Sequence, residues 1–401
     1  MQWHFTPAGT LAFAALALFV GRLIIAKVRF LQEYSIPAPV IGGLIPAIAV
    51  ALLRLGGMEF TFDASLQPGL LLAFFATVGL SADLRLIARG GRALLLFFGC
   101  VVAVIVLQNL IGVGLALAMG VDPLIGLLAG SISMSGGHGT AAAWGAKFSE
   151  SYGLSAATGI GLAAATFGLV VGGLLGGPVG KRLTAQLRSR GRELGTIHEP
   201  GLNDAAEAKE PFTPDRLITS IFLIAACSAV GNWLCLKAEN PAFTLPPFVW
   251  TLFVGVVLRN LFSLFRTRDI DSGALDFAGS VALSLFLAMA LMSLKLWELA
   301  ALAGPMLAIL PAQAVLVWLF VTRVTFPVTG RDYDAALLAA GQTGFALGAT
   351  PTALVNMETL AKRYGWSARA FLIVPIVGAF MIDLANAVVL SGFVQVLARW
   401  R

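Results

Sequence analysis

Long apolar runs, separated by short charged segments, constrain this chain more than any other feature. Residues 94–107 and 299–320 carry no charge, and similar runs recur from end to end. An α-helix needs about 20 mostly apolar residues to cross the hydrocarbon core of a bilayer. Charged residues make up 12% of the 401 residues, against roughly 25% in soluble domains. We therefore expect an all-α polytopic membrane protein, because the alternating pattern of outer-membrane strands is absent.

Hydropathy predicts ten spanning helices. They cover residues 7–26, 36–54, 68–84, 93–119, 156–180, 217–236, 246–262, 277–295, 300–322 and 370–396. The first run has no basic segment before it and no small-residue cleavage site after it. We therefore expect it to be a membrane span and not a removed signal peptide.

Two further apolar stretches, 122–149 and 332–365, are interrupted near their centres by glycine-rich sequence. Each stretch can supply two helical arms of about 11 or 12 residues. At about 1.5 Å per residue, such an arm reaches about 17 Å, roughly half of the hydrocarbon core, so a re-entrant hairpin fits. Broken backbone is tolerated at this depth only where protein or a water-filled cavity satisfies it. The glycines therefore point to a functional site.

Basic residues favour cytoplasmic loops and so orient the chain. An external N-terminus places Lys27 and Arg29 inside, together with the central loop 183–214. The hairpin at 122–149 then enters from outside and the hairpin at 332–365 from the cytoplasm. Because the formal charge of +6 comes from bases at span ends, it does not indicate nucleic-acid binding. The three cysteines have neither metal-ligand nor disulfide spacing, and we expect no transition-metal site.

The two halves of the chain resemble each other. Pro37 matches Pro246 and Gly137 matches Gly348, each pair being about 210 positions apart. Five spans per half is an odd number, so the halves must insert in opposite orientations, as in many secondary transporters. We expect a first inverted repeat over 1–182 and a second over 215–401, with the two hairpin tips meeting near the midplane.

The first glycine cluster precedes the helix-forming residues 141–144 and supplies donors for a substrate carboxylate. A helix N-terminus offers unpaired amides and a positive dipole end, and hydroxyl groups add further donors. The predicted substrate-binding residues here are Ser133, Ser135, Gly136, Gly137, His138, Gly139 and Thr140. The alternative is that these small residues only permit close helix packing.

The second glycine cluster offers Gln342, Thr343, Gly344, Thr350 and Thr352 as substrate-binding residues. Pro351 suits the first turn of a helix arm. Whether this hairpin clamps a carboxylate or gives carbonyl ligands to sodium stays open. His138 has two readings of equal weight: a substrate contact, or a neutral histidine that shapes the turn.

Asp383 is a carboxylate near the middle of the last span, which makes it a functional-site candidate by default. Asn386 lies three residues on and so on the same helix face. Both side chains offer oxygen to a sodium ion, and Asn109 and Thr77 are further candidates. Asp383 could instead pair with a substrate ammonium, and a polar pair that joins helices is the structural alternative.

The chain resembles the bacterial sodium/glutamate symporters of the glutamate:sodium symporter family nearly end to end. The stretches that carry the resemblance are 36–44, 72–82, 122–144, 284–300 and 344–353. The resemblance implies symport of L-glutamate with sodium ions into the cell by a secondary active transporter of the bacterial inner membrane. In that membrane, the orientation expected from the basic residues makes the N-terminus periplasmic. It further implies two inverted five-span repeats in a homodimer that works as an elevator. We expect membrane lipid as a further partner and no enzymatic activity. The alternatives are a sodium/proton antiporter and a sodium symporter of another small organic anion.

Overall fold

The computed structural model describes residues 2–29, 31, 37–55, 58–189, 213–238, 245–264, 271–293 and 303–398. Its elements are helices, apart from two short parallel strands, β1 (Gln2–His4) and β2 (Glu59–Thr61). Six of the helices are long and apolar enough to cross a membrane. The chain is therefore a multi-pass, helical membrane protein. Its helices form two compact units, which we call unit 1 and unit 2.

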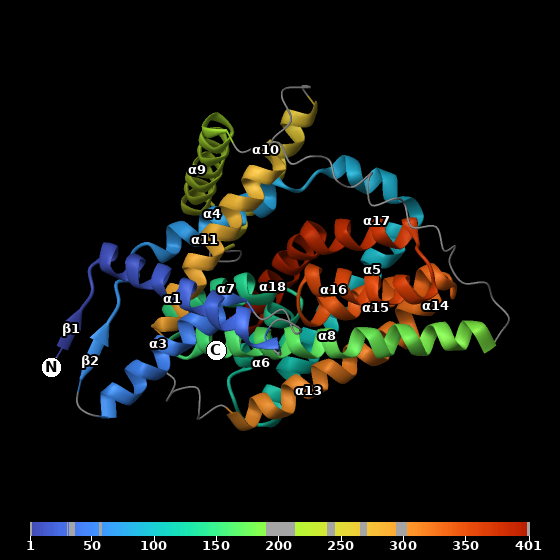
Figure 1. Ribbon diagram of the computed structural model, residues 1–401, viewed down its shortest axis with the longest axis horizontal. Coiled ribbons are helices and arrows are strands. Elements are labelled where there is room, and N and C mark those ends of the chain that lie inside the picture. Colours follow the sequence, from blue (N-terminus) through green and yellow to red (C-terminus); the bar gives the residue numbers. More distant parts are fainter. Residues whose placement is uncertain are drawn as a thin grey trace. The chain divides into compact units, whose positions relative to one another are not determined.

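Unit 1 comprises residues 1–81, 138–166 and 215–307. Its described helices include α1 (Pro7–Lys27), α3 (Ala38–Leu55), α4 (Gln67–Leu80), α7 (Gly137–Tyr152), α9 (Pro214–Lys237), α10 (Pro247–Leu264) and α11 (Ser272–Met292). Helix α4 packs against α10 and α11 (Figure 1). Buried residues of α4, α9 and α11, among them Ala76, Cys227 and Leu275, form one core cluster.

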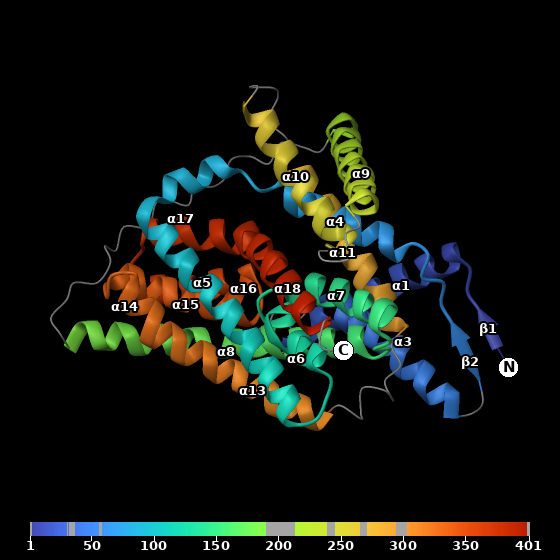
Figure 2. The same cartoon turned by 180° about the vertical axis from the view of Figure 1, so that it is seen from behind.

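Unit 2 comprises residues 82–137, 167–214 and 308–401. It contains α5 (Leu84–Ala118), α6 (Pro123–Leu127), most of α8 (Ala157–Ser189) and of α13 (Ala303–Phe320), α14 (Phe326–Val328), α15 (Tyr333–Leu347), α16 (Thr350–Tyr364), α17 (Ala368–Ile376) and α18 (Ile382–Ala398). Three π-helical turns interrupt this unit: η1 (Leu128–Ile132), η2 (Val321–Thr325) and η3 (Val377–Met381). Helix α5 packs along α6 and α18 (Figure 2).

Most helices follow the predicted spans closely, but α5 and α8 differ. Helix α5 begins at Leu84, before the predicted start at residue 93, and is kinked at Gly91. A span ending at residue 180 and a loop starting at 183 were expected, whereas α8 continues to Ser189. Its last turns bury Leu183 and Leu187 and expose Arg182 and Arg188, so the extension is amphipathic and hydropathy alone misses it. Residues 190–212 of the predicted loop lie outside the described part of the chain.

Both glycine clusters break a helix, as predicted. The first break separates η1 from α7, and the second separates α15 from α16. The arms α15 and α16 have 15 residues each, slightly longer than expected. Pro351 lies in the first turn of α16, the position that a proline favours.

Candidate functional site

The two glycine-rich breaks meet inside unit 2. Gly137 has φ +65, a left-handed conformation that glycine adopts without strain, and the helix restarts there as α7. A methyl group on Gly137 would lie 3.3 Å from the Gly348 carbonyl oxygen. The amides of Ser135 and Gly136 donate to the Ser131 carbonyl, at 3.2 and 2.9 Å. The two tips therefore lie side by side in this structure, and their position at the membrane midplane stays a prediction.

Gln108 of α5 joins the two breaks. Its Nε2 donates to the Ala346 carbonyl at 2.8 Å, and its Oε1 accepts a hydrogen bond from Ser135 Oγ at 2.7 Å. Gln313 Nε2 of α13 donates to the backbone carbonyl of Gln108 at 2.8 Å. Gln108 and Gln313 are fully buried. A carboxamide suits this position because it donates and accepts at the same time.

Three polar residues converge next to the first break. The Ser131 amide donates to Asn109 Oδ1 at 3.1 Å, and Ser131 Oγ donates to Asn386 Oδ1 at 2.6 Å. Asn386 Nδ2 in turn donates a hydrogen bond to the Ser131 carbonyl at 3.1 Å. The structure thus brings together two of the predicted sodium ligands, Asn109 and Asn386, on a residue of η1. Carboxamide and hydroxyl oxygens keep lone pairs for a hard cation.

Asp383 lies in the first turn of α18, directly after η3, and is half-buried. Among the described residues it has no hydrogen-bond or ion-pair partner, while Asn386 three residues on faces Ser131. Uncompensated charge at membrane depth is costly, which favours a cation near this carboxylate. The π-turn before Asp383 is a backbone feature often found at functional sites.

Three of the predicted residues of the second hairpin form side-chain hydrogen bonds within the protein. Gln342 Oε1 accepts from Thr325 Oγ1 at 2.6 Å, Thr343 Oγ1 donates to the Ala339 carbonyl at 2.8 Å, and Thr350 Oγ1 donates to the Gly378 carbonyl at 2.5 Å. Gly344 packs its backbone against Ala353 and Thr352.

Five buried polar atoms of unit 2 have no hydrogen-bond partner among the described residues. They are Asn109 Nδ2, Gln313 Oε1, Gln342 Nε2, Thr352 Oγ1 and Gln395 Nε2. Because a buried polar atom without a partner costs about 1–3 kcal/mol, each such atom calls for an explanation. Three of the five belong to residues predicted to bind substrate or sodium: Asn109, Gln342 and Thr352.

The remaining predicted residues belong to unit 1 or are enclosed by protein. His138 Nε2 lies 3.1 Å from Thr166 Oγ1, and that hydroxyl donates its own proton to the Leu162 carbonyl. His138 must therefore donate to Thr166. Thr77 Oγ1 donates to the Phe74 carbonyl, and the Phe74 ring lies against Gly139.

Thr140 is buried in unit 1, and Ser133 is buried beside the first break. Within unit 2, the structure gathers the two breaks with Asn109 and Asn386. The roles of His138, Gly139, Thr140 and Thr77 stay predictions.

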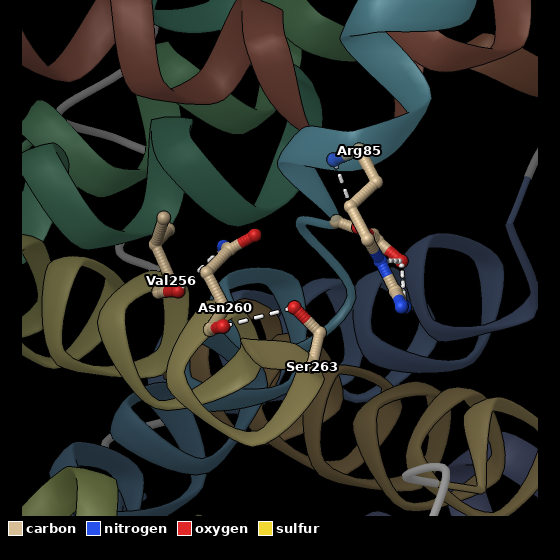
Figure 3. Close-up of polar contacts among 5 residues, drawn as sticks. Arg85, Val256, Asn260 and Ser263 are labelled. Carbon is tan, nitrogen blue, oxygen red and sulfur yellow. Dashed lines mark hydrogen bonds and ion pairs between the residues drawn. The ribbon is translucent and has the colours of Figure 1, made fainter. Parts of the chain in front are cut away.

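Polar residues near other helix ends have local partners (Figure 3). In unit 2, Arg85 forms an ion pair with Asp83 at 2.8 Å beside the start of α5. In unit 1, Asn260 Nδ2 donates to the Val256 carbonyl at 2.8 Å, and Ser263 Oγ donates to the Asn260 carbonyl at 2.9 Å. These contacts satisfy groups at helix ends, where charged and polar residues are expected.

Sequence reasoning missed several members of the unit 2 network. Ser131 stood inside the glycine cluster but was given no role, and Gln313 and Thr325 were not singled out. The available signal was the isolated polar residue in an apolar run, such as Gln313 within 303–320. The π-turns have no composition of their own that would reveal them.

Comparisons with known proteins agree on one family. The family model described as "Sodium/glutamate symporter" matches residues 3–366. The chain is 47% identical to the sodium/glutamate symporters of Escherichia coli strain K12 and Shigella flexneri, over 98% of each chain. It is 42% identical to that of Haemophilus influenzae, with the same coverage. A solved sodium/proton antiporter from Methanocaldococcus jannaschii aligns over 97% of each chain, with TM-score 0.39 and 16% identity, a likeness too weak to carry an argument.

Proposed function

The chain belongs to the sodium/glutamate symporter family, and from this membership we propose that it carries L-glutamate into the cell together with sodium ions. One observation in the structure supports the proposal most directly. The two glycine-rich breaks meet in unit 2, and Gln108 joins them by hydrogen bonds at 2.7 and 2.8 Å. Broken helices whose polar groups converge are the usual substrate and ion sites of secondary transporters.

The second break supplies the substrate end of this proposal. Helix α16 begins at Thr350 without a side-chain cap, so its first amides and its positive dipole end face a ligand rather than a capping group. Thr352 Oγ1 and Gln342 Nε2, which lack partners among the described residues, are further donors. A glutamate carboxylate needs donors of this kind.

The first break supplies the sodium end. Carboxamide, hydroxyl and carbonyl oxygens come together here, because Ser131 forms hydrogen bonds with both Asn109 and Asn386. Asp383 on the same helix as Asn386 adds the negative charge that a sodium ion requires. Sodium is the cargo here and not a resident cofactor.

The inverted-repeat topology is part of the same proposal, and paired local features support it. The Val40 amide donates to the Pro37 carbonyl and the Val249 amide to the Pro246 carbonyl, both at 3.0 Å. Helices α3 and α10, which follow these prolines, have 18 residues each. Equivalent turns at matching positions of both halves are expected of an internal repeat.

Two more pairs of matching residues in the two halves support the internal repeat. Asp122 caps α6 and Asp332 caps α15, each by accepting a hydrogen bond from a backbone amide of the first turn. Gly153 and Gly365 end α7 and α16, each with a positive φ. Each compact unit draws segments from both halves. We propose two inverted repeats over 1–182 and 215–401, in a homodimeric, elevator-type transporter of the bacterial inner membrane with a periplasmic N-terminus.

Asp383→Asn tests the sodium assignment. The change keeps the size and removes the charge, so the half-saturating sodium concentration for glutamate uptake into proteoliposomes should rise at least tenfold. Asp332→Asn is the matched control, because asparagine caps a helix as well as aspartate does and uptake should be unchanged. If sodium dependence persists while glutamate affinity falls, Asp383 pairs with the substrate ammonium. Normal uptake on both measures would remove Asp383 from the site.

A further inference from the structure

A basic cavity of about 580 Å³ lies between α8 and α16 of unit 2. None of the proposed substrate or sodium residues lines it. Its walls include Lys181, Arg182 and Arg363, together with Pro178, Leu360 and Tyr364. Three positively charged side chains therefore surround one cavity.

These charges have no anionic partner in the described part of the chain. No described carboxylate lies within salt-bridge distance of Lys181, Arg182 or Arg363. Glu358 is exposed on α16 but does not line the cavity. The three side chains are themselves exposed. The cavity is therefore strongly positive and open to an anion from outside the described protein.

Aromatic rings hold the guanidinium groups in place. Arg182 lies 5.3 Å from the ring centre of Trp318, and Arg363 lies 5.5 Å from that of Tyr364. Arg188 covers the same Tyr364 ring at 5.2 Å. A stacked guanidinium keeps the N–H donors along its edge, which match the oxygens of a phosphate group. The cavity thus has the donors for a phosphate monoanion or diester.

The surfaces that lead into the cavity are apolar. Helices α8 and α16 run in parallel, because Gly176 meets Asn356 and Gly180 meets Leu360. About two turns before the basic residues, their outer faces expose Leu174 by 49% and Val355 by 52%. An apolar surface that ends in a cationic cavity matches an amphiphile, with acyl chains along the helices and a phosphate at their ends.

We propose that this cavity binds the phosphate headgroup of an anionic phospholipid. The proposal does not depend on the transported substrate. Purified protein should retain phosphatidylglycerol and not phosphatidylcholine in native mass spectrometry. Phosphatidylglycerol should also raise the midpoint of thermal unfolding in detergent by several degrees, whereas millimolar inorganic phosphate should not.

The double variant Arg182→Gln/Arg363→Gln should lose at least tenfold in phosphatidylglycerol binding. The control Arg323→Gln/Lys362→Gln removes the same charge from exposed positions outside the cavity and should bind as the unchanged protein does. The single variant Lys181→Gln disturbs no aromatic stack, so it tests the proposal even if the double variant folds poorly. Its affinity for phosphatidylglycerol should fall several-fold. Equal losses in variant and control, equal binding of phosphatidylcholine, or occupation by inorganic phosphate at millimolar concentration would each overturn the proposal.

Discussion

Gln108 shows how one side chain can hold two broken helices together. It forms hydrogen bonds with Ser135 beside one break and with Ala346 beside the other. Ala346 lies 238 positions after Gln108 in the sequence. Aspartate and glutamate could accept but not donate here, and leucine could do neither. Both partners of Gln108 therefore require a side chain that donates and accepts.

Gln108→Leu should cost about 2–4 kcal/mol of stability, because it removes two buried hydrogen bonds and leaves Ser135 Oγ and the Ala346 carbonyl without them. Uptake of glutamate should fall at least tenfold, since the two breaks lose their link. Thermal unfolding and proteoliposome uptake measure the two effects. Gln186→Leu, the same change at an exposed position of α8, is the control. Wild-type stability for Gln108→Leu would mean that the link is not needed.

At this scale the sequence predicts some of the network and misses the rest for a physical reason. Asn109 and Asn386 were predicted from polarity at membrane depth, and both contact Ser131. Gln313 was not predicted, because its partner Gln108 is 205 positions away. A polar residue in an apolar run reveals that it needs a partner, but only the packing of the helices determines which partner it finds.

Helix α8 binds the second hairpin through a stripe of glycines. Gly168, Gly172, Gly176 and Gly180 are spaced four apart and so share one helix face. A methyl group at 168 would collide with the Leu347 carbonyl, and one at 180 would collide with Leu360. Asn356 Nδ2 donates to the Gly172 carbonyl at 3.1 Å, which requires this close approach. The stripe holds the hairpin backbone against α8.

Gly168→Ala should therefore separate α8 from the hairpin and lower both stability and uptake, the latter several-fold. The Leu347 carbonyl is backbone and cannot move aside as a flexible side chain can. Gly99→Ala is the matched control, because a methyl group there meets nothing within 4 Å. In helix α5 this change should be neutral or stabilise by up to about 1 kcal/mol. Similar behaviour of the two variants in thermal unfolding would contradict the close-packing account.

The hairpin tips should be reachable from water. Single cysteines at Ser135 and Thr350, in a chain without Cys100, Cys227 and Cys235, should react with small polar thiol reagents. Sodium and glutamate should slow the reaction at one or both positions, because the proposed cargo site lies at the tips. A cysteine at Leu128, which is fully buried in η1, is the unreactive control. Reactivity that neither ligand changes would contradict the placement of the cargo at the tips.

Elements were easier to predict than their internal irregularities. The first span was expected over 7–26 and α1 covers 7–27, because an uninterrupted apolar run has one favourable structure in lipid. Glycine clusters predicted both breaks. The π-turns were missed, since a shift of the hydrogen bonds by one residue depends on packing around η1 and η3. The tail of α8 was missed because its amphipathic turns have low mean hydropathy.

At the scale of the whole molecule, each compact unit takes segments from both halves of the chain. Unit 1 combines 1–81 with 215–307, and unit 2 combines 82–137 with 308–401. Sequence offsets predicted that the halves correspond, but the sorting of their segments into units was not predicted. It depends on which helices pack together, and hydropathy does not report that.

The last prediction concerns coupling between the two cargoes. A symporter must favour the empty and the fully loaded protein over half-loaded states, so each ligand should tighten binding of the other. Linkage makes the effect reciprocal, and coupling energies of about 1–3 kcal/mol correspond to roughly 5- to 150-fold in affinity. Glutamate affinity should therefore rise by a factor in this range between sodium-free and sodium-rich buffer. Sodium affinity should rise by the same factor when glutamate is added.

Choline chloride at equal ionic strength is the control, because glutamate is an anion and salt alone screens its attraction to the protein. Isothermal titration of the purified protein measures both affinities. Asp383→Asn should reduce the coupling factor if Asp383 holds sodium, while Asp332→Asn should leave it unchanged. A glutamate affinity that is the same in sodium and in choline would refute symport, because an uncoupled carrier cannot use the sodium gradient to accumulate its substrate.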